Sequence, residues 1–294
     1  MLQIQKSYKE KEQGNTKGIL YLVGTPIGNL EDMSYRAIRI LKEVDLIAAE
    51  DTRQTIKLLN HFEIQKKLVS YHEHNKKTSG LELLKHLENG LDVALVSDAG
   101  LPAISDPGYD LTVQAVEEEI KVIPIAGPNA ALLGLIASGL STERFVFLGF
   151  LPRDKKGLFE ELKRVQVYPE TLIYYEAPHR ILKTLSAMRE VLGNRSISLS
   201  RELTKKFEEF LRGSLEEVID HISEVGIKGE CLIVIEGRKN HEEATQDAWW
   251  NTLSIEKHVE HYIEKGNNSK EAVKLVSKDR ELSKREVYKE YHQI

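Results

Sequence analysis

Three glycine-bearing loops in the first half of the chain have the composition of a cofactor-binding site. Each directly follows an apolar, strand-like run, and they comprise residues 24–29 (GTPIGN), 97–108 (SDAGLPAISDPG) and 126–131 (AGPNAA). Glycine lets the backbone approach a ligand closely and proline stiffens a turn, so such loops contact a cofactor largely through main-chain groups. Because open α/β sheets bind ligands at the carboxyl ends of their strands, the three junctions predict one shared pocket. The alternative is a set of ordinary strand-to-helix turns.

The fingerprints of several common cofactors are incomplete or missing. A dinucleotide site needs Gly-x-Gly-x-x-Gly after the first strand, whereas this chain has Gly24 and Gly28 with Pro26 between them. An NAD-linked enzyme is therefore the weaker interpretation, although Glu50 and Asp51 do follow the second strand-like run. No P-loop sequence follows the glycine loops, and no histidine pair has metal-ligand spacing with a convincing partner. We expect no catalytic metal.

Composition and length indicate a folded protein of more than one domain. The 294 residues suit two domains with a small appendage. The net charge of −5 argues against a protein that binds nucleic acid over its whole surface by neutralising phosphates. Cys231, the only cysteine, lies in an apolar run, which predicts a core position and excludes a disulfide within the chain. Neither a membrane-spanning stretch nor a signal-peptide centre is visible, so we expect a cytoplasmic protein.

Strand and helix patterns alternate in the first domain, which we place at residues 17–138. They predict an α/β layer with a mostly parallel sheet, followed by a buried helix over 131–137. Ser34 and Ser79 are predicted to begin helices as amino-terminal caps. Asp106, before Pro107, is also predicted to cap a helix. The predicted strands cover residues 19–23, 45–49, 68–71, 92–97 and 121–125.

The second domain, residues 139–238, carries a mixed pattern, and a helical appendage follows at 241–294. In the second domain, the strand-like runs at 196–200 and 207–211 are joined by a short link that predicts a hairpin. Other strands are expected within 145–153 and near 171–175 and 231–236. The appendage shows helices starting near Ser269 and Ser283, with Trp249 and Trp250 on the apolar side. It is typical of a compact helix-turn-helix, and a protein contact or a structural cap would explain it as well as a nucleic-acid role. Residues 1–16 form a charged amino-terminal extension.

Six motifs in order give the chain a resemblance to a known family. It resembles the ribosomal RNA small subunit methyltransferase I family, which belongs to the tetrapyrrole-methylase-like, class III methyltransferases. The resemblance runs from about residue 17 to 238 and departs from the family pattern in the charged extension and at Asn129, where a smaller residue is common. The motifs are LVGTPIGNLED (22–32), AEDTR (49–53), the 97–108 loop, GFLPR (149–153), YEAPHR (175–180) and RELTK (201–205).

The resemblance implies a two-domain, tetrapyrrole-methylase-like fold, a homodimer, and S-adenosylmethionine bound between the domains. It also implies methylation of the 2′-hydroxyl of a cytidine in the decoding region of small-subunit (16S) ribosomal RNA. Carried over by position, the second domain would meet the adenosine end, and Asp98, Gly100, Leu101 and Ile104 would hold the methionine part. The implied cofactor contacts are Pro26, Ile27, Asp98, Gly100, Leu101, Ile104, Asn129, Ala130, Tyr175, Glu202 and Glu230.

Methyl transfer to an alcohol needs alignment more than a strong base, because the hydroxyl loses its proton as the new bond forms. We expect Asp51 or Glu176 as the base, and the expected substrate contacts are Arg53, Arg153, His179 and Arg180. An ion-pair network at an interface would explain the same charged residues. Two other functions stay open: a tetrapyrrole or other small-molecule methyltransferase, and an inactive ribosome-assembly binding protein.

Overall fold

The computed structural model describes residues 4–7, 17–104, 106–238, 250, 253–280 and 282–292. Most of the expected extension over 1–16 lies outside these residues, as does Trp249. The chain forms two compact units. The first comprises Met1–Gln166 and Glu170–Glu236, and the second comprises Val167–Pro169 and Gly237–Ile294. No helix among the described residues is long and apolar enough to cross a bilayer.

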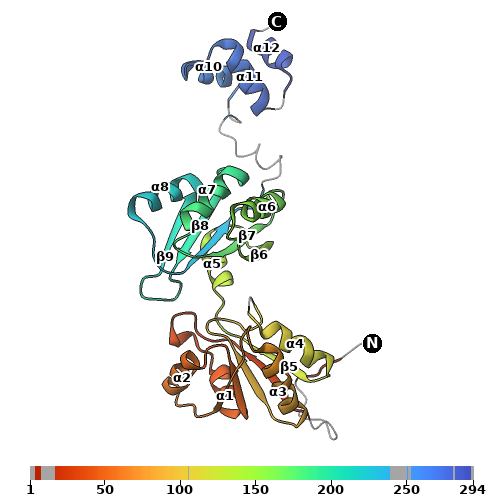
Figure 1. The fold of residues 1–294 in the computed structure, drawn as a ribbon. Helices are drawn as coiled ribbons and strands as arrows, with labels where there is room; N and C mark the ends of the chain where they lie inside the picture. Colours follow the sequence, from red (N-terminus) through yellow and green to blue (C-terminus); the bar gives the residue numbers. More distant parts are fainter. Residues whose placement is uncertain are drawn as a thin grey trace. The chain divides into compact units, whose positions relative to one another are not determined.

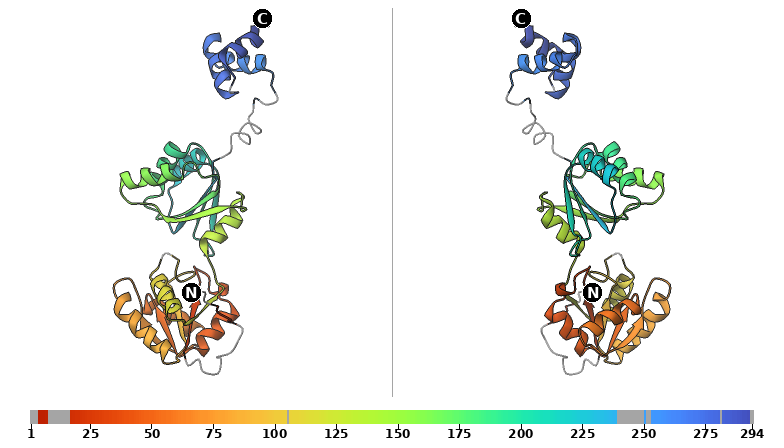
Figure 2. Two further views of the ribbon diagram at one scale, coloured as in Figure 1. Left: turned by 90° about the vertical axis from the view of Figure 1, so that its right-hand side faces the viewer. Right: turned by 90° about the vertical axis from the view of Figure 1, so that its left-hand side faces the viewer.

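The first sheet was predicted to be mostly parallel and is wholly parallel, with strand order β3-β2-β4-β1-β5. Figure 1 labels its strand β5 and the helices α1–α4 around it. Helices cover both faces: α1 and α2 pack with one apolar cluster, and α3 and α4 with another (Figure 2). Burial on both faces explains why the central strands read as continuous apolar runs. The elements are β1 (Ile19–Val23), η1 (Leu30–Asp32), α1 (Tyr35–Glu43), β2 (Leu46–Ala49), α2 (Thr52–His61), β3 (Lys67–Ser70), α3 (Lys76–Glu88), β4 (Val93–Val96), α4 (Gly108–Glu117) and β5 (Lys121–Ile125).

The predicted helix caps are partly right. The Ser34 hydroxyl accepts a hydrogen bond from the Ala37 N–H, so this prediction is confirmed. The prediction for Ser79 is wrong, because α3 begins earlier and its N-cap residue is Asn75. Ser79 lies inside α3, with its N–H bonded to the Asn75 carbonyl. The polar residues before Ser79 gave no apolar periodicity from which to recognise this first turn.

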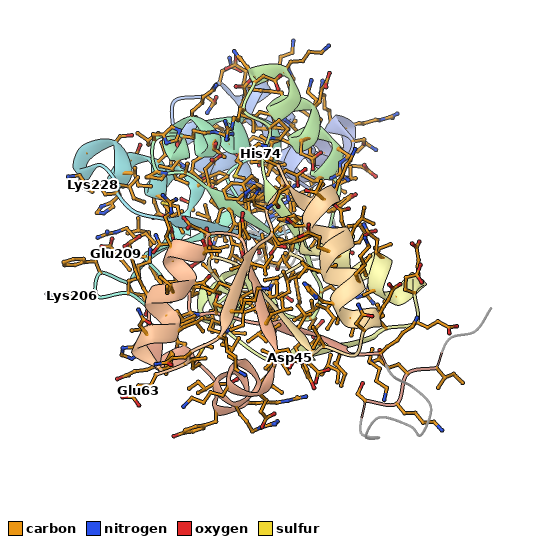
Figure 3. All side chains as sticks on the ribbon, turned by 60° about the horizontal axis from the view of Figure 1, so that its bottom comes forward. Asp45, Glu63, His74, Lys206, Glu209 and Lys228 are labelled. Atoms are coloured by element: carbon orange, nitrogen blue, oxygen red, sulfur yellow. The ribbon has the colours of Figure 1, made fainter. Side chains whose placement is uncertain are left out.

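The second sheet is mixed and has the strand order β6-β7-β10-β8-β9. β6 runs parallel to β7, while β7, β10, β8 and β9 pair antiparallel in turn. The predicted β8–β9 hairpin is confirmed; Figure 3 labels Lys206 and Glu209 on it. The elements are α5 (Ala130–Ser138), β6 (Phe145–Phe150), α6 (Lys155–Val165), β7 (Thr171–Glu176), α7 (Ile181–Leu192), β8 (Ser196–Arg201), β9 (Glu209–Ser214), α8 (Leu215–Val225) and β10 (Cys231–Ile235).

Helix α5 packs on the second sheet with one side only. Ala131 and Leu135 join an apolar cluster with Leu232 and Val234 of β10. Ile136 on the other side is 70% exposed, so the prediction of a helix buried on every side is wrong. Uniform apolarity gave no periodicity from which to choose the buried side.

The three glycine-bearing loops meet through their backbones. A Cβ on Gly127 would lie 2.8 Å from the Gly24 Cα, and one on Gly24 would lie 2.9 Å from the Gly127 Cα. Thr25 and Gly100 exchange two backbone hydrogen bonds, with N···O distances of 2.9 and 3.1 Å. These contacts require glycine at the crossing and fix all three loops to one another.

Among the described residues of the second unit, α10 (Ile255–Glu264), α11 (Ser269–Asp279) and α12 (Lys284–His292) pack around one apolar cluster. His258 is fully buried in it and stacks on Trp250 and Tyr262. The Arg280 guanidinium donates to its Nδ1 at 3.1 Å, and its Nε2 lies 3.3 Å from Asp279 Oδ2. Since Nδ1 accepts a hydrogen bond, we assign the imidazole proton of the neutral ring to Nε2.

The backbone crossing predicts that Gly127→Ala destabilises the protein by about 1–3 kcal/mol, because the added methyl overlaps the Gly24 backbone. Gly80→Ala is the matched control. Gly80 lies inside α3, and a Cβ there would make only ordinary van der Waals contacts, so we expect the free energy of unfolding to rise by about 0.5–1 kcal/mol. Urea unfolding followed by circular dichroism measures both changes. Wild-type stability in Gly127→Ala would contradict the observed crossing.

The buried histidine predicts a pH-dependent stability of the second unit. Burial and the Arg280 charge lower the pKa of His258 below its ordinary 6.5. Only the unfolded state then takes up a proton just below pH 6.5, so stability is full above that value and is lost as the pH falls towards the folded pKa. Tryptophan fluorescence during thermal unfolding should report a falling midpoint.

The pH dependence of the unfolding midpoint should weaken in His258→Gln. It should persist in His221→Gln, which serves as a control at an exposed position on α8. An acid-insensitive midpoint in the wild type would show that the His258 environment is wrong.

Candidate functional site

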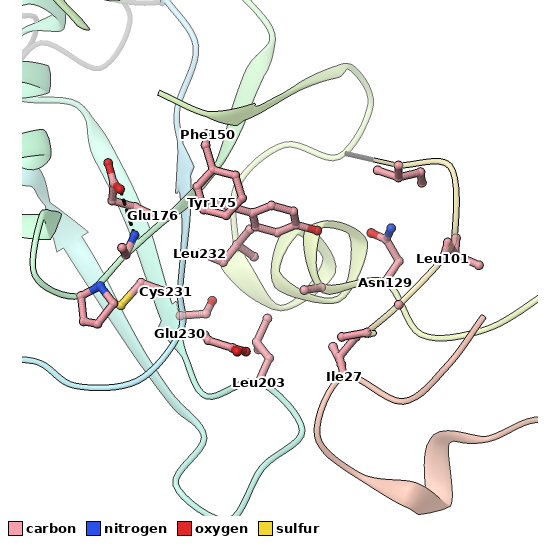
Figure 4. A pocket seen from close by; sticks show the side chains of 17 residues that line it. Ile27, Leu101, Asn129, Phe150, Tyr175, Glu176, Leu203, Glu230, Cys231 and Leu232 are labelled. Atoms are coloured by element: carbon pink, nitrogen blue, oxygen red, sulfur yellow. Dashed lines mark hydrogen bonds between the residues drawn. The ribbon is translucent and has the colours of Figure 1, made fainter. Parts of the chain in front are cut away.

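A cavity of about 430 Å³ lies where the three loops face the second sheet (Figure 4). This volume falls within the range of small-molecule sites. All three loops contribute to its wall, so the prediction of one shared pocket is confirmed. The lining residues are Ile27, Ala99, Gly100, Leu101, Ile104, Asn129, Ala130, Phe150, Tyr175, Glu176, Ala177, Pro178, Ser200, Leu203, Glu230, Cys231 and Leu232.

Most of the residues expected from the loops of the first sheet lie at the cavity. Gly100 adopts φ +82°, a conformation that favours glycine, and a Cβ there would stand 3.5 Å from Ile27. The Asn129 side chain accepts from the Leu132 N–H and thereby caps α5, which fixes its place in the wall. Pro26 and Asp98 are not among the lining residues.

The two aspartates of the 97–108 loop have different structural roles. Asp106 Oδ1 accepts hydrogen bonds from the N–H groups of Ala103 and Gly108, at 2.8 and 2.7 Å, so it bonds the first residue of α4, whose N-cap residue is Pro107 and not Asp106 as predicted. Burial raises the pKa of Asp106. Asp98 caps no helix; its Oδ1 accepts from the Asp51 N–H at 3.0 Å and ties the loop to the start of α2. The Asp98 carboxylate is exposed beside the cavity-lining Ala99.

Of the residues expected from the second domain, Tyr175 and Glu230 line the cavity, whereas Glu202 is not among the lining residues. Tyr175 packs against the rings of Phe147 and Phe150, with centroids 5.1 and 5.5 Å away. The Glu202 carboxylate accepts from the Glu230 N–H at 2.9 Å, which is the main reason that its pKa is lowered. Lys205 bridges Glu202 and Glu230, at 3.1 and 3.0 Å.

The Glu176 carboxylate is turned away from the cavity, although the residue lines it (Figure 4). It is fully buried and accepts from the Ala177 N–H at 2.9 Å and the Thr184 hydroxyl at 2.6 Å. Arg180 Nε lies 3.4 Å from it. A carboxylate with its oxygens occupied in this way holds the 176–180 turn, so the expectation that Glu176 is a base does not match its geometry.

Asp51 is the N-cap residue of α2, and its carboxylate forms a two-point ion pair with Arg53, at 3.0 and 2.8 Å. This hydrogen bonding lowers the pKa of Asp51 to about 2. A carboxylate with such a pKa is a weak proton acceptor at neutral pH. Asp51 is also absent from the cavity wall, so the geometry favours an orienting role over that of a base.

The four expected substrate contacts separate into two groups. Arg53, Arg153 and His179 are exposed and can reach a large partner. Arg180 is held by the Leu151 and Pro152 carbonyls at 3.1 and 2.9 Å, besides Glu176, so its expected contact with a phosphate is at odds with this geometry. None of the four lines the cavity.

Sequence reasoning missed the floor of the cavity on the second sheet. Ser200, Leu203 and Leu232 line it, together with Phe150 and Cys231. Phe150 and Leu203 lie within the GFLPR and RELTK motifs, whereas Ser200 and Leu232 are brought to one face by the register of β8 and β10. Cys231 is buried and free, as predicted, and burial raises the pKa of its thiol to about 11.

Comparison with known proteins agrees with this architecture. The family described as tetrapyrrole (corrin/porphyrin) methylases matches residues 19–219. A ribosomal RNA small subunit methyltransferase I from Halalkalibacterium halodurans is 56% identical over 292 residues, covering 99% of this chain and 100% of the relative. The protein of that name from Bacillus subtilis (strain 168) is 54% identical over 292 residues, covering 99% of each chain.

Solved structures share the fold at low identity. A diphthine synthase matches with a TM-score of 0.59 and 14% identity, covering 77% of this chain and 93% of its own. A uroporphyrin-III C-methyl transferase from Thermus thermophilus, complexed with S-adenyl homocysteine, matches with a TM-score of 0.52 and 20% identity, covering 74% and 97%. The predicted α/β, two-sheet fold is confirmed. By its sequence and its fold, this chain belongs to the tetrapyrrole methylase family and, within it, to the ribosomal RNA small subunit methyltransferase I family.

Proposed function

We propose that this chain transfers a methyl group from S-adenosylmethionine to the 2′-hydroxyl of a cytidine in the decoding region of small-subunit ribosomal RNA. The observation that carries the proposal is the cavity between the three crossed loops and the second sheet, in a chain 56% identical to a protein named for ribosomal RNA methylation. The named relatives support ribosomal RNA as the methyl acceptor. The choice of nucleotide and of the ribose oxygen rests on the motif resemblance.

The residues of the cavity fit this cofactor. The leucines Leu203 and Leu232 form an apolar floor that suits a planar base, and the buried Ser200 hydroxyl among them has no hydrogen-bond partner among the described residues. Gly100 leaves room where a side chain would narrow the wall. The expected contacts Ile27, Leu101, Ile104 and Ala130 would hold the cofactor, with Tyr175 and Glu230 at the adenosine end.

When bound, the cofactor would supply an electrophilic methyl carbon on a positively charged sulfur. Transfer of the methyl group to the ribose oxygen would leave the sulfur neutral and release the hydroxyl proton to solvent. The contribution of the protein is alignment, and good alignment can supply about 7–11 kcal/mol of the barrier. The crossed loops suit this task, because Gly24, Gly127 and Gly100 leave them little freedom to shift. An apolar wall also excludes water from the reacting atoms.

The charged residues around the cavity then have supporting roles. Asp51 orients Arg53, whose exposed guanidinium would contact a phosphate, and Glu176 orients Arg180 to hold the 176–180 turn. Arg153 and His179, both exposed, would extend the contact with RNA. A homodimer, with the small ribosomal subunit as substrate, completes the proposal.

The reaction is tested with methyl-labelled S-adenosylmethionine and small ribosomal subunits from cells that lack the enzyme. We expect label in the RNA, in a dinucleotide that resists alkaline hydrolysis, because a 2′-O-methyl group removes the nucleophile that cleaves the chain. Label in an alkali-sensitive position would contradict ribose methylation. Label transferred only to an added tetrapyrrole, or transferred nowhere despite tight RNA binding, would favour the two other functions.

Asp98→Ala should weaken binding of S-adenosylhomocysteine about tenfold, because the exposed carboxylate next to Ala99 is proposed to attract the ammonium group of the methionine part. Isothermal titration calorimetry measures the change. Asp110→Ala is the control, because Asp110 pairs with Lys76 and does not line the cavity. Equal affinities of Asp98→Ala and wild type would remove Asp98 from the site.

A further inference from the structure

Ser200 is the buried polar group that the proposed reaction leaves without a role. It lies on β8, is 0% exposed and lines the cavity. Its hydroxyl has no hydrogen-bond partner among the described residues. A buried hydroxyl without a partner is unfavourable, and such groups in native proteins are usually satisfied by a partner, a water or a ligand.

Strand register places this hydroxyl at the floor of the cavity beneath α5. Ser200 pairs with Leu232 of β10, and directly opposed residues share one face of a sheet. A Cβ on Gly134 of α5 would lie 3.5 Å from Ser200 Oγ and 1.9 Å from Leu232 Cδ2, so both side chains point towards the helix. Gly134 leaves the room that they occupy.

Ser198 provides an internal comparison. It lies two residues away on the same face of β8, is also 0% exposed, and its hydroxyl also has no partner among the residues that the structure describes. It does not line the cavity. Of the two serines, therefore, only Ser200 belongs to the cavity lining, while both share the strand, the burial and the absence of a hydrogen-bond partner among the described residues.

The surroundings indicate which part of the cofactor meets Ser200. Leu232, beside Ser200, and Leu203 are apolar lining residues that suit a flat ring, whereas the backbone-rich loops around Gly100 suit a charged amino-acid part. The edge of a purine carries both acceptor nitrogens and an amino donor, and a serine hydroxyl can donate or accept.

We propose that the Ser200 hydroxyl hydrogen-bonds the edge of the adenine ring and thereby makes binding selective for an adenosine-bearing donor. The inference rests on the proposed function, because it takes S-adenosylmethionine as the cofactor. Ser200 is on this account a specificity residue. It holds the base in place while the crossed loops hold the other end of the cofactor.

The test compares Ser200→Ala and Ser198→Ala in the full chain by calorimetry with S-adenosylhomocysteine. Loss of one neutral hydrogen bond predicts about tenfold weaker binding for Ser200→Ala, and a change below about twofold for Ser198→Ala. Equal affinities of Ser200→Ala and wild type would overturn the inference. Equal weakening in both variants would do so too, because it would indicate general loosening of the face under α5.

A second measurement identifies the contacted group and separates this inference from the proposed function. Adenosine, titrated as a competitor of S-adenosylhomocysteine, should lose affinity for Ser200→Ala by the same factor as the complete molecule. Unchanged adenosine affinity would overturn the adenine assignment. A wild-type chain that fails to bind S-adenosylhomocysteine at all would instead contradict the proposed function.

Discussion

The site depends on a backbone crossing in which two loops touch with no side chain between them. Gly24 and Gly127 approach so closely that a single added methyl would overlap the opposite backbone, and Thr25 and Gly100 join the third loop by paired hydrogen bonds. Each loop leaves the carboxyl end of a strand in one parallel sheet, so the sheet sets their spacing. The cofactor wall is consequently rigid before any ligand arrives, which is what a reaction that depends on alignment requires.

The opposite wall is made by different chemistry. The second sheet contributes leucines, the rings of Phe150 and Tyr175, and one serine hydroxyl, while the carboxylates of Glu176 and Glu202 accept backbone N–H groups. Each of these two carboxylates also pairs with a cation. The charged motifs that drew attention in the sequence thus serve mainly to build the cavity.

Local patterns were sufficient to predict the strands, the β8–β9 hairpin and the loops of the first sheet. They failed where tertiary contacts determine the bounds of a strand, the direction of a side chain or its burial. In β9, Phe207 suggested an early start, but it is 64% exposed, and the strand continues through Arg212, whose guanidinium binds the Ala137 carbonyl of α5. Ser200 could not be recognised as part of the site, because its direction follows from pairing with Leu232, which is 32 positions away. Neither could the burial of Glu176, which depends on Thr184 and Arg180 in the following turn and helix.

The most direct test of the central claim is a crystal structure of the protein with S-adenosylhomocysteine. We expect ligand density in the cavity, with the amino-acid part along the backbone of the Gly100 loop and the adenine over Leu203 and Leu232 within hydrogen-bond distance of Ser200. Density for the whole ligand outside this cavity would contradict the claim that the crossed loops hold the methyl donor.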